Sequence, residues 1–248
     1  MVPGFSVGLI GARLSERRFR RAMDRGMNMD DPSAEDAAWT LAARPVTSPL
    51  CDAFFLVAES VYVGPESGMT PTQWEAERIP LPRPNLPLRA PSRVAAADVA
   101  GKEDVLAAHY DGLIRVAQSH GRTRALAEPF PFFAIRPALL DSEEVLASWP
   151  WSDTLPEALG VLEVLSRVGE AAPGRVILDE LEQGWGLRIV AGQGTICLVE
   201  WDGEGPPPAD AAWCLEASVL AGQAAEARDR LRSVHVRLTQ LLGWDFWS

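Results

Sequence analysis

The chain has 248 residues, 47% of them hydrophobic, and a formal net charge of −11. This length can bury a substantial core in one large domain or two small ones, and the composition excludes wholesale disorder. No apolar run approaches the roughly 20 residues that a membrane helix needs, so an integral membrane protein is not expected.

The negative charge is concentrated in the C-terminal part of the chain. Residues 92–248 hold 13 basic residues against 23 acidic ones, a net charge of −10, whereas residues 1–91 are nearly neutral. An acidic surface repels nucleic acids and membrane surfaces and attracts basic partners. The charge therefore predicts neither a nucleic-acid nor a membrane partner, although solubility alone is the simpler explanation for it.

A short strand is expected at residues 5–10 and a helix at residues 14–25. No basic residue precedes the apolar N-terminal stretch, which argues against a secretory signal and favours a cytoplasmic location. Six arginines lie between positions 13 and 25. In so acidic a chain they are more typical of a solvated helix face than of a nucleic-acid contact.

Residues 30–91 combine a helix, an apolar strand and a proline-rich segment. Asp30 and Pro32 mark the start of a helix that ends before Pro45. Residues 53–63 are apolar on both faces and predict an interior strand, in which Glu59 either pairs with an arginine or faces a cleft. Five prolines in residues 79–91 exclude a helix and a central strand.

The proline-rich segment suggests a division into domains. We expect an N-terminal α/β portion at residues 1–79, a strap or linker at residues 80–91, and a C-terminal α+β domain at residues 92–248. Within the last, residues 102–120 predict a helix, residues 130–136 a short strand and residues 141–147 a short helix. Thr154 and Glu157 have the spacing of a capping box, which predicts a helix over residues 155–168.

The last third of the chain predicts a meander and a long helix. Gly-bearing breaks at residues 182–184 and 192–194 divide residues 175–201 into three short apolar runs. These predict a three-stranded antiparallel meander. An apolar stripe then continues at nearly heptad spacing and predicts a helix over residues 211–242 that covers one face of the meander. The stripe consists of Trp213, Leu220, Ala224, Ala227, Leu231, Val234, Leu238 and Leu241. The predicted fold class is therefore α+β.

The sequence contains no recognisable catalytic, cofactor or metal motif. The glycines near the N-terminus do not have dinucleotide spacing, and no phosphate-binding loop occurs. The three histidines lack partners at metal-ligand spacing, so no cofactor and no metal are predicted. The cysteines, at positions 51, 197 and 214, are odd in number. We expect them to be small buried residues and not disulfides.

The candidate site is a binding surface. Asp179 and Glu180 are neighbours in a strand and point to opposite faces, so they cannot act as a carboxylate pair. Glu182 shares the face of Glu180, and with Glu200 these acids predict an acidic patch, although solvated strand exteriors also explain them. Six of the nine tryptophans follow residue 149, and residues 243–247 are aromatic. Such rings either pack on the body or form a contact surface. The candidate binding residues are Glu180, Glu182, Trp185, Glu200, Trp201, Trp244 and Trp247.

The run from Gly184 to Ile189, then Gly194-Thr195, Trp213-Cys214 and a long helix before a Trp-rich end, resembles some bacterial immunity proteins. The resemblance covers about the last 75 residues. It implies a cytoplasmic, non-enzymatic α+β protein that binds and blocks a cognate toxin, for which a basic toxin domain is the partner that the charge favours. Two alternatives stay open: a small-molecule enzyme whose carboxylates, Glu59 among them, meet only in the fold, and a structural subunit that forms a homodimer through the long helix.

Overall fold

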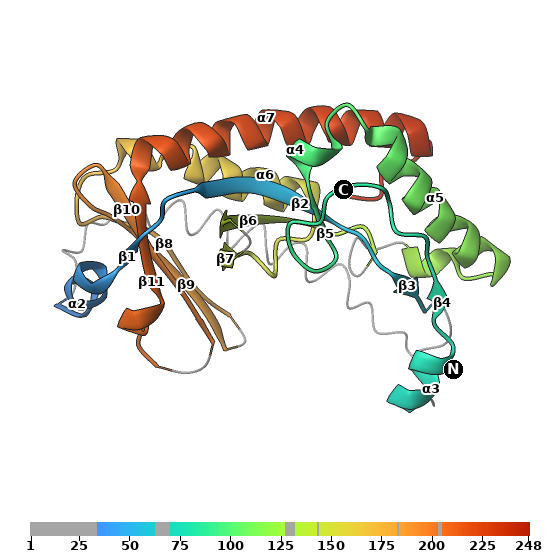
Figure 1. Cartoon of the computed structure of the whole chain (residues 1–248), viewed down its shortest axis with the longest axis horizontal. Coiled ribbons are helices and arrows are strands. Elements are labelled where there is room, and N and C mark those ends of the chain that lie inside the picture. Colours follow the sequence, from blue (N-terminus) through green and yellow to red (C-terminus); the bar gives the residue numbers. More distant parts are fainter. Residues whose placement is uncertain (1–33, 63–69, 127–131, 143, 183, 203–204) are drawn as a thin grey trace, which may run out of the picture. The chain divides into compact units, whose positions relative to one another are not determined.

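The structure is a computed structural model that describes residues 34–62, 70–126, 132–142, 144–182, 184–202 and 205–248 (Figure 1). The strand and helix expected at residues 5–10 and 14–25 lie outside these ranges. The chain is α+β, as predicted. The contacts of the described residues define two compact units, one of the residues up to 45 and of residues 168–218, and the other of residues 46–167 and 219–248. The proline-rich segment at residues 80–91, which was predicted to separate two domains, lies within the second unit.

The first unit contains a five-stranded sheet with the order β1-β11-β10-β9-β8. The predicted antiparallel meander is present as β8 (Val176–Glu182), β9 (Trp185–Ala191) and β10 (Thr195–Asp202). Gly194 at the turn between β9 and β10 has φ +72°, a conformation that glycine adopts at no steric cost. The sheet is extended by β11 (Ala212–Glu216), antiparallel to β10, and by β1 (Arg44–Pro45), parallel to β11.

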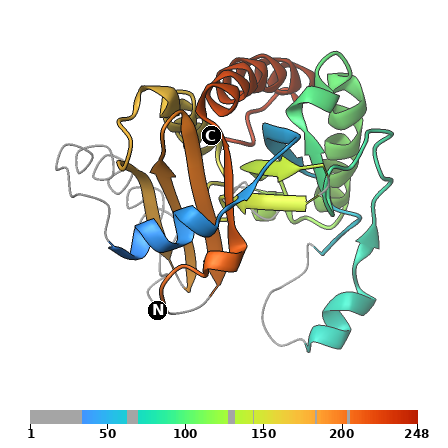
Figure 2. The same ribbon diagram turned by 60° about the vertical axis from the view of Figure 1, so that its left-hand side comes forward.

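One face of this sheet is covered by α2 (Ala34–Ala42), which lies across the strands in Figure 2. The helix ends before Pro45, as predicted. Its Trp39 is 1% exposed and packs with Val190, Cys197, Val199 and Ala212. Short 3₁₀ turns, η2 (Val168–Glu170) and η3 (Ala209–Ala211), flank the sheet in sequence.

Two predictions for this unit were wrong. Residues 212–216 form strand β11, and the helix α7 (Ala217–Leu242) begins only afterwards. Trp213 therefore does not belong to the helical stripe. In β11, Cys214 lies opposite Cys197 of β10, with Cα atoms 4.2 Å apart, and the two form a disulfide. The third cysteine, Cys51, is free and buried, as predicted.

The second unit contains a four-stranded sheet with the order β5-β2-β6-β7. Strand β2 (Pro49–Leu56) lies between β5 (Arg93–Ala95) and β6 (Ile135–Asp141), and β7 (Glu144–Ser148) forms the far edge. The expected interior strand is thus confirmed but ends at Leu56. A separate two-stranded pair, β3 (Ser60–Val61) with β4 (Ile79–Pro80), follows. The helix expected at residues 141–147 is instead a hairpin, because Ser142 turns the chain with φ +58°.

The helices of this unit include the predicted ones. Residues 103–119 form α5 (Glu103–Ser119), and α6 (Leu155–Leu165) begins with the predicted capping box of Thr154 and Glu157. Shorter helices are α3 (Pro71–Ala76), α4 (Ala96–Val99) and the 3₁₀ turn η1 (Thr123–Leu126). The proline-rich segment packs on its own unit, because Leu81 and Leu86 are 7% and 6% exposed.

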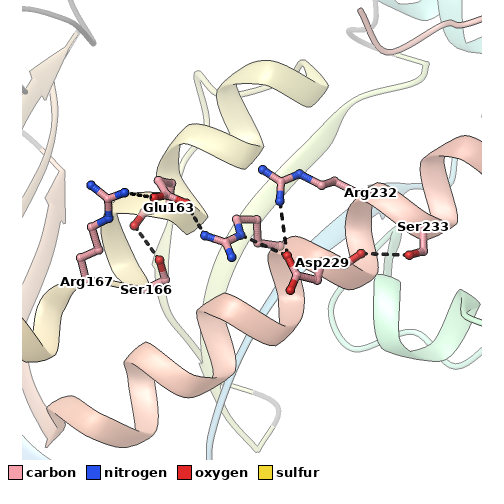
Figure 3. Close-up of polar contacts among 7 residues, drawn as sticks. Glu163, Ser166, Arg167, Asp229, Arg232 and Ser233 are labelled. Carbon is pink, nitrogen blue, oxygen red and sulfur yellow. Dashed lines mark hydrogen bonds and ion pairs between the residues drawn. The ribbon is translucent and has the colours of Figure 1, made fainter.

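The long C-terminal helix α7 packs against antiparallel strands. Its Gln223 accepts a hydrogen bond from the backbone N–H of Cys51 and donates one to the carbonyl of Pro49, both in β2 and both at 2.8 Å. On α6, Glu163 pairs with Arg228 of α7 and with Arg167, while Asp229 pairs with Arg232 further along α7 (Figure 3). The apolar stripe of the helix is buried from Leu220 to Leu238, whereas Leu241 is 40% exposed.

Candidate functional site

The meander brings four carboxylates together on one face of the first sheet. Directly paired residues of neighbouring strands place their side chains on the same face. Leu187 of β9 pairs with Glu180 of β8 and with Glu200 of β10. Trp185 pairs in the same way with Glu182 and Asp202. We call this surface, formed by Glu180, Glu182, Trp185, Glu200 and Asp202, the acidic face.

The acidic face thus consists of two short rows, each with an apolar residue between two carboxylates. Leu187 at the centre of the first row is fully buried, and Trp185 at the centre of the second is partly exposed. The strand period of two residues produces this grid, because Glu180 and Glu182 are two positions apart, as are Glu200 and Asp202. Glu180 and Glu182 were predicted to share a face and Glu200 to belong to the same acidic patch, whereas Asp202 was missed although its spacing from Glu200 indicates it.

Glu180 is the acid of this face whose ionisation is most disfavoured by its surroundings. Burial, and then repulsion from Glu182, raises the pKa of Glu180 to about 7. A substantial fraction of Glu180 therefore carries a proton near neutral pH. A positive charge near Glu180 would lower this pKa, because it would favour the ionised carboxylate.

The opposite face of the same strands has a different character. Trp201 of β10 pairs with Gly186 of β9, and its ring occupies the space above this glycine: a Cβ atom at position 186 would lie 2.4 Å from the ring. Beside it is a hollow of about 370 Å³. Arg188 of β9 and Asp179 of β8 form an ion pair at 3.2 Å in its wall. The other lining residues are Leu181, Trp201, Gly205, Pro206 and Pro207.

The predicted binding residues of the meander are consequently divided between two faces. Trp185 lies with the acids, and Trp201 lies with the hollow on the other side of the sheet. The indole Nε1 atoms of both are buried without a hydrogen-bond partner among the described residues. Each face therefore holds a hydrogen-bond donor that the described part of the chain leaves unused.

The two C-terminal tryptophans, both in the second unit, differ from each other. Trp247 is fully buried, with its ring centroid 5.5 to 6.0 Å from those of Tyr110, Phe133 and Phe55. Its carbonyl accepts a hydrogen bond from the N–H of Leu155 at the start of α6. Trp247 therefore belongs to the core and is not part of a surface, whereas Trp244 is 68% exposed.

A buried ion pair in the second unit was not predicted from the sequence. Asp52 in β2 is fully buried, lies 3.1 Å from Arg230 of α7 and accepts hydrogen bonds from the N–H groups of Ala53 and Ala97. Burial raises its pKa to about 6, against the opposing effect of Arg230. These contacts tie α7 and α4 to the central strand, which is a structural role.

The described residues offer little to the enzyme alternative. Glu59 is exposed in the connection between β2 and β3 and is not part of a buried strand. His235 of α7 contacts Asp245 at 3.0 Å beside Trp247, at the C-terminus of the chain. Within the described ranges, no three His, Cys, Asp or Glu side chains are placed to hold a metal ion. Nor do these ranges include a helix long and apolar enough to cross a membrane.

Comparison with known proteins gives no further guide to the site. No protein-family model matches the sequence, and no match is found among curated proteins or among solved structures.

Proposed function

We propose that this protein is a non-enzymatic, immunity-type binding protein of the cytoplasm, which neutralises a cognate bacterial toxin by occluding the toxin's site. The proposed partner is a basic toxin domain that binds the acidic face. The observation that supports this most directly is the grid of four carboxylates around Trp185. The net charge of −11 supports it as well, because an acidic protein attracts a basic partner over a distance.

Glu180 is costly to ionise, because burial first and repulsion from Glu182 second raise its pKa. A lysine or arginine placed between the two rows would relieve the repulsion and gain charge-assisted hydrogen bonds. Trp185 supplies the apolar contact area that interface anchors commonly provide. The combination favours a protein surface as the ligand over a free metal ion.

The homodimer through α7 receives less support. The stripe that would form its seam is buried within the chain between Leu220 and Leu238. Only the other side of the helix is available to a second copy.

Binding to a purified basic toxin domain, chosen from any toxin-like reading frame found beside this gene, tests the proposal. In the variant Glu180→Gln/Glu200→Gln, we expect the dissociation constant for that toxin to rise about tenfold, because two carboxylates that face the partner are neutralised. The matched control is Glu77→Gln/Glu144→Gln, which replaces two exposed glutamates elsewhere. The control should change binding less than about twofold. Equal effects of the two variants would show that net charge and not the acidic face determines binding.

A growth assay tests the neutralisation itself. Cells that produce the toxin should survive with the wild-type protein and with the control variant, and should survive less well with the acidic-face variant. Failure of the wild-type protein both to bind the toxin and to protect cells would refute the proposed function.

A further inference from the structure

Strand β8 is an edge of the five-stranded sheet. The order β1-β11-β10-β9-β8 leaves one side of β8 without a partner strand in the part of the chain that the structure describes. An edge of this kind presents backbone N–H and C=O groups to which a further strand can be added.

The hydrogen bonds of β9 show which groups of β8 point outward. The N–H of Gly192 bonds to Thr195 on the β10 side, and the N–H of Ala191 bonds to Arg175 on the β8 side. Because successive residues of a strand direct their backbone groups to alternate sides, Leu187 and Trp185 also face β8. Their partners there are Glu180 and Glu182. The backbone groups of Asp179 and Leu181 therefore point away from the sheet.

The two faces beside this edge differ in what they would accept. On one face, the side chains nearest the edge are the carboxylates of Glu180 and Glu182. On the other, Leu181 is 70% exposed and stands next to the hollow lined by Trp201, Pro206 and Pro207. A strand added along β8 would alternate its side chains between the two faces. One set would meet the acids, and the other would meet Leu181 and the hollow, whose wall also contains the Arg188–Asp179 ion pair.

We propose that β8 accepts an extended segment of a basic partner as a sixth strand, in which lysine or arginine alternates with apolar residues. The basic residues face Glu180 and Glu182, and the apolar residues lie against Leu181 and the hollow beside Trp201. This inference rests on the proposed function, since it states how the basic partner is held. It adds the secondary structure and the residue pattern of the segment that binds.

The charge of β8 disfavours a second copy of this chain as the occupant. Antiparallel pairing of two β8 strands would bring the carboxylates of both copies onto the same faces at short distance. Like charges directly opposite each other destabilise a strand pair. A basic segment reverses the sign of every such contact.

Two peptides of identical composition test the pattern. The first is acetylated Arg-Val-Arg-Val-Arg-Val, and the second is its permutation Arg-Arg-Arg-Val-Val-Val. Binding to the full chain is measured by calorimetry at low salt. We expect the alternating peptide to bind about tenfold more tightly, because only it can place charges on one face and valines on the other. Equal affinities would mean attraction by charge alone and would overturn the proposal.

Amide hydrogen exchange tests the strand addition directly. On binding of the alternating peptide, the amides of Asp179 and Leu181 should exchange at least about tenfold more slowly, because their N–H groups gain acceptors. The amide of Glu180, already bonded to β9, should change much less. Binding without this alternation along β8 would overturn the proposal.

A matched pair of variants isolates the backbone contact. Leu181→Pro and Leu181→Ala both shorten the side chain, but only proline removes the outward N–H, and proline is tolerated at such edge positions. We expect the proline variant to bind the alternating peptide about fivefold more weakly than the alanine variant. Methylating the peptide's own backbone nitrogens should weaken binding to the unchanged protein in the same way. Full binding of the methylated peptide would refute strand addition even if the proline variant did not fold.

The outcome separates this inference from the proposed function. A toxin that binds the acidic face without protecting the amides of Asp179 and Leu181 would leave the function standing and refute the sixth strand. If a peptide adds to β8 but the protein neutralises no toxin, the sixth strand would stand and the proposed function would be refuted. Association of the free chain into dimers with these amides protected would replace the basic partner with a second copy.

Discussion

Replacing Trp247 with alanine tests whether the C-terminal residues belong to the core of the second unit. The side chain is 0% exposed, and its ring meets Phe55 of β2, Tyr110 of α5 and Phe133. The strand and the helix contact the same indole, which lies five residues beyond the end of α7 at Leu242. The substitution leaves the backbone hydrogen bond from Leu155 to residue 247 in place. The loss is therefore one of packing.

The expected loss of stability in Trp247→Ala follows from the burial of the indole. Removing a fully buried aromatic side chain costs about 3 to 5 kcal/mol, through lost burial and the cavity left behind. A domain of this kind is stable by about 5 to 15 kcal/mol, so the change is a large fraction of the free energy of unfolding. Urea unfolding, followed by circular dichroism and by hydrogen exchange in β2 and α6, measures it. Hydrogen exchange is needed in addition to circular dichroism, because it reports on the second unit separately and two units need not unfold in a single transition.

The matched control is Trp244→Ala, three residues earlier. Trp244 is 68% exposed, so its removal should change the free energy of unfolding by less than about 0.5 kcal/mol. Similar destabilisation by the two variants, or none by Trp247→Ala, would show that the indole of Trp247 is not packed in the core. Neither variant is expected to affect strand addition at β8, which involves other residues.

Three further predictions concern charge and the disulfide. The pKa of Glu180 is raised to about 7 in the folded protein, so the free energy of unfolding falls as pH rises from about 4.5 through 7. In urea unfolding, Glu180→Gln should therefore be more stable than the wild type by at most about 3 kcal/mol at pH 8 and should differ little from it at pH 4. The variant Arg230→Met leaves the buried Asp52 carboxylate without its cation and should lose about 3 to 5 kcal/mol at pH 7.5. Because burial raises the pKa of Asp52 to about 6, that loss should shrink at pH 5, and a loss independent of pH would contradict the argument. Opening the bridge between Cys197 and Cys214, 17 positions apart, should lower the stability of the first unit by about 3 kcal/mol, measured by urea unfolding with and without reductant. Three thiols detected in the protein unfolded without reductant would show that the bridge is absent.

The redox state of Cys197 and Cys214 in cells tests the predicted cytoplasmic location. Disulfides are rare in that compartment, so Cys197 and Cys214 are expected there as adjacent thiols across β10 and β11. Alkylation of the protein in intact cells, followed by mass measurement, distinguishes the two states.

Elements with a strong local signal were predicted from the sequence. The helix at residues 155–165 begins at a capping box whose partners, Thr154 and Glu157, are three residues apart, so the whole signal is local. The meander was predicted for a related reason, since glycines mark its turns and apolar residues alternate between them. The same period of two residues placed Glu180 and Glu182 on one face, whereas the strand register decided that Glu200 lies beside them.

Elements whose sequence pattern fits both a helix and a strand were not predicted correctly. A spacing of seven residues joins Trp213 to the stripe of α7, but pairing with Leu198 of β10 makes residue 213 part of a strand. Residues 141–147 have a helical composition, and their hairpin exists because Leu139 and Leu140 pair with Ala147 and Val145. In both places a non-local strand partner outweighs the weak local propensity.

The sequence by itself determined the acidic character of the chain, the meander and the side of each strand on which an acid lies, because charge and the two-residue period are properties of neighbours along the chain. Only the tertiary structure decided that Cys197 meets Cys214, that Asp52 meets Arg230 and that Trp247 is core while Trp244 is surface. These depend on contacts between residues far apart in sequence, and their free energies arise from burial and desolvation that exist only once the chain has folded.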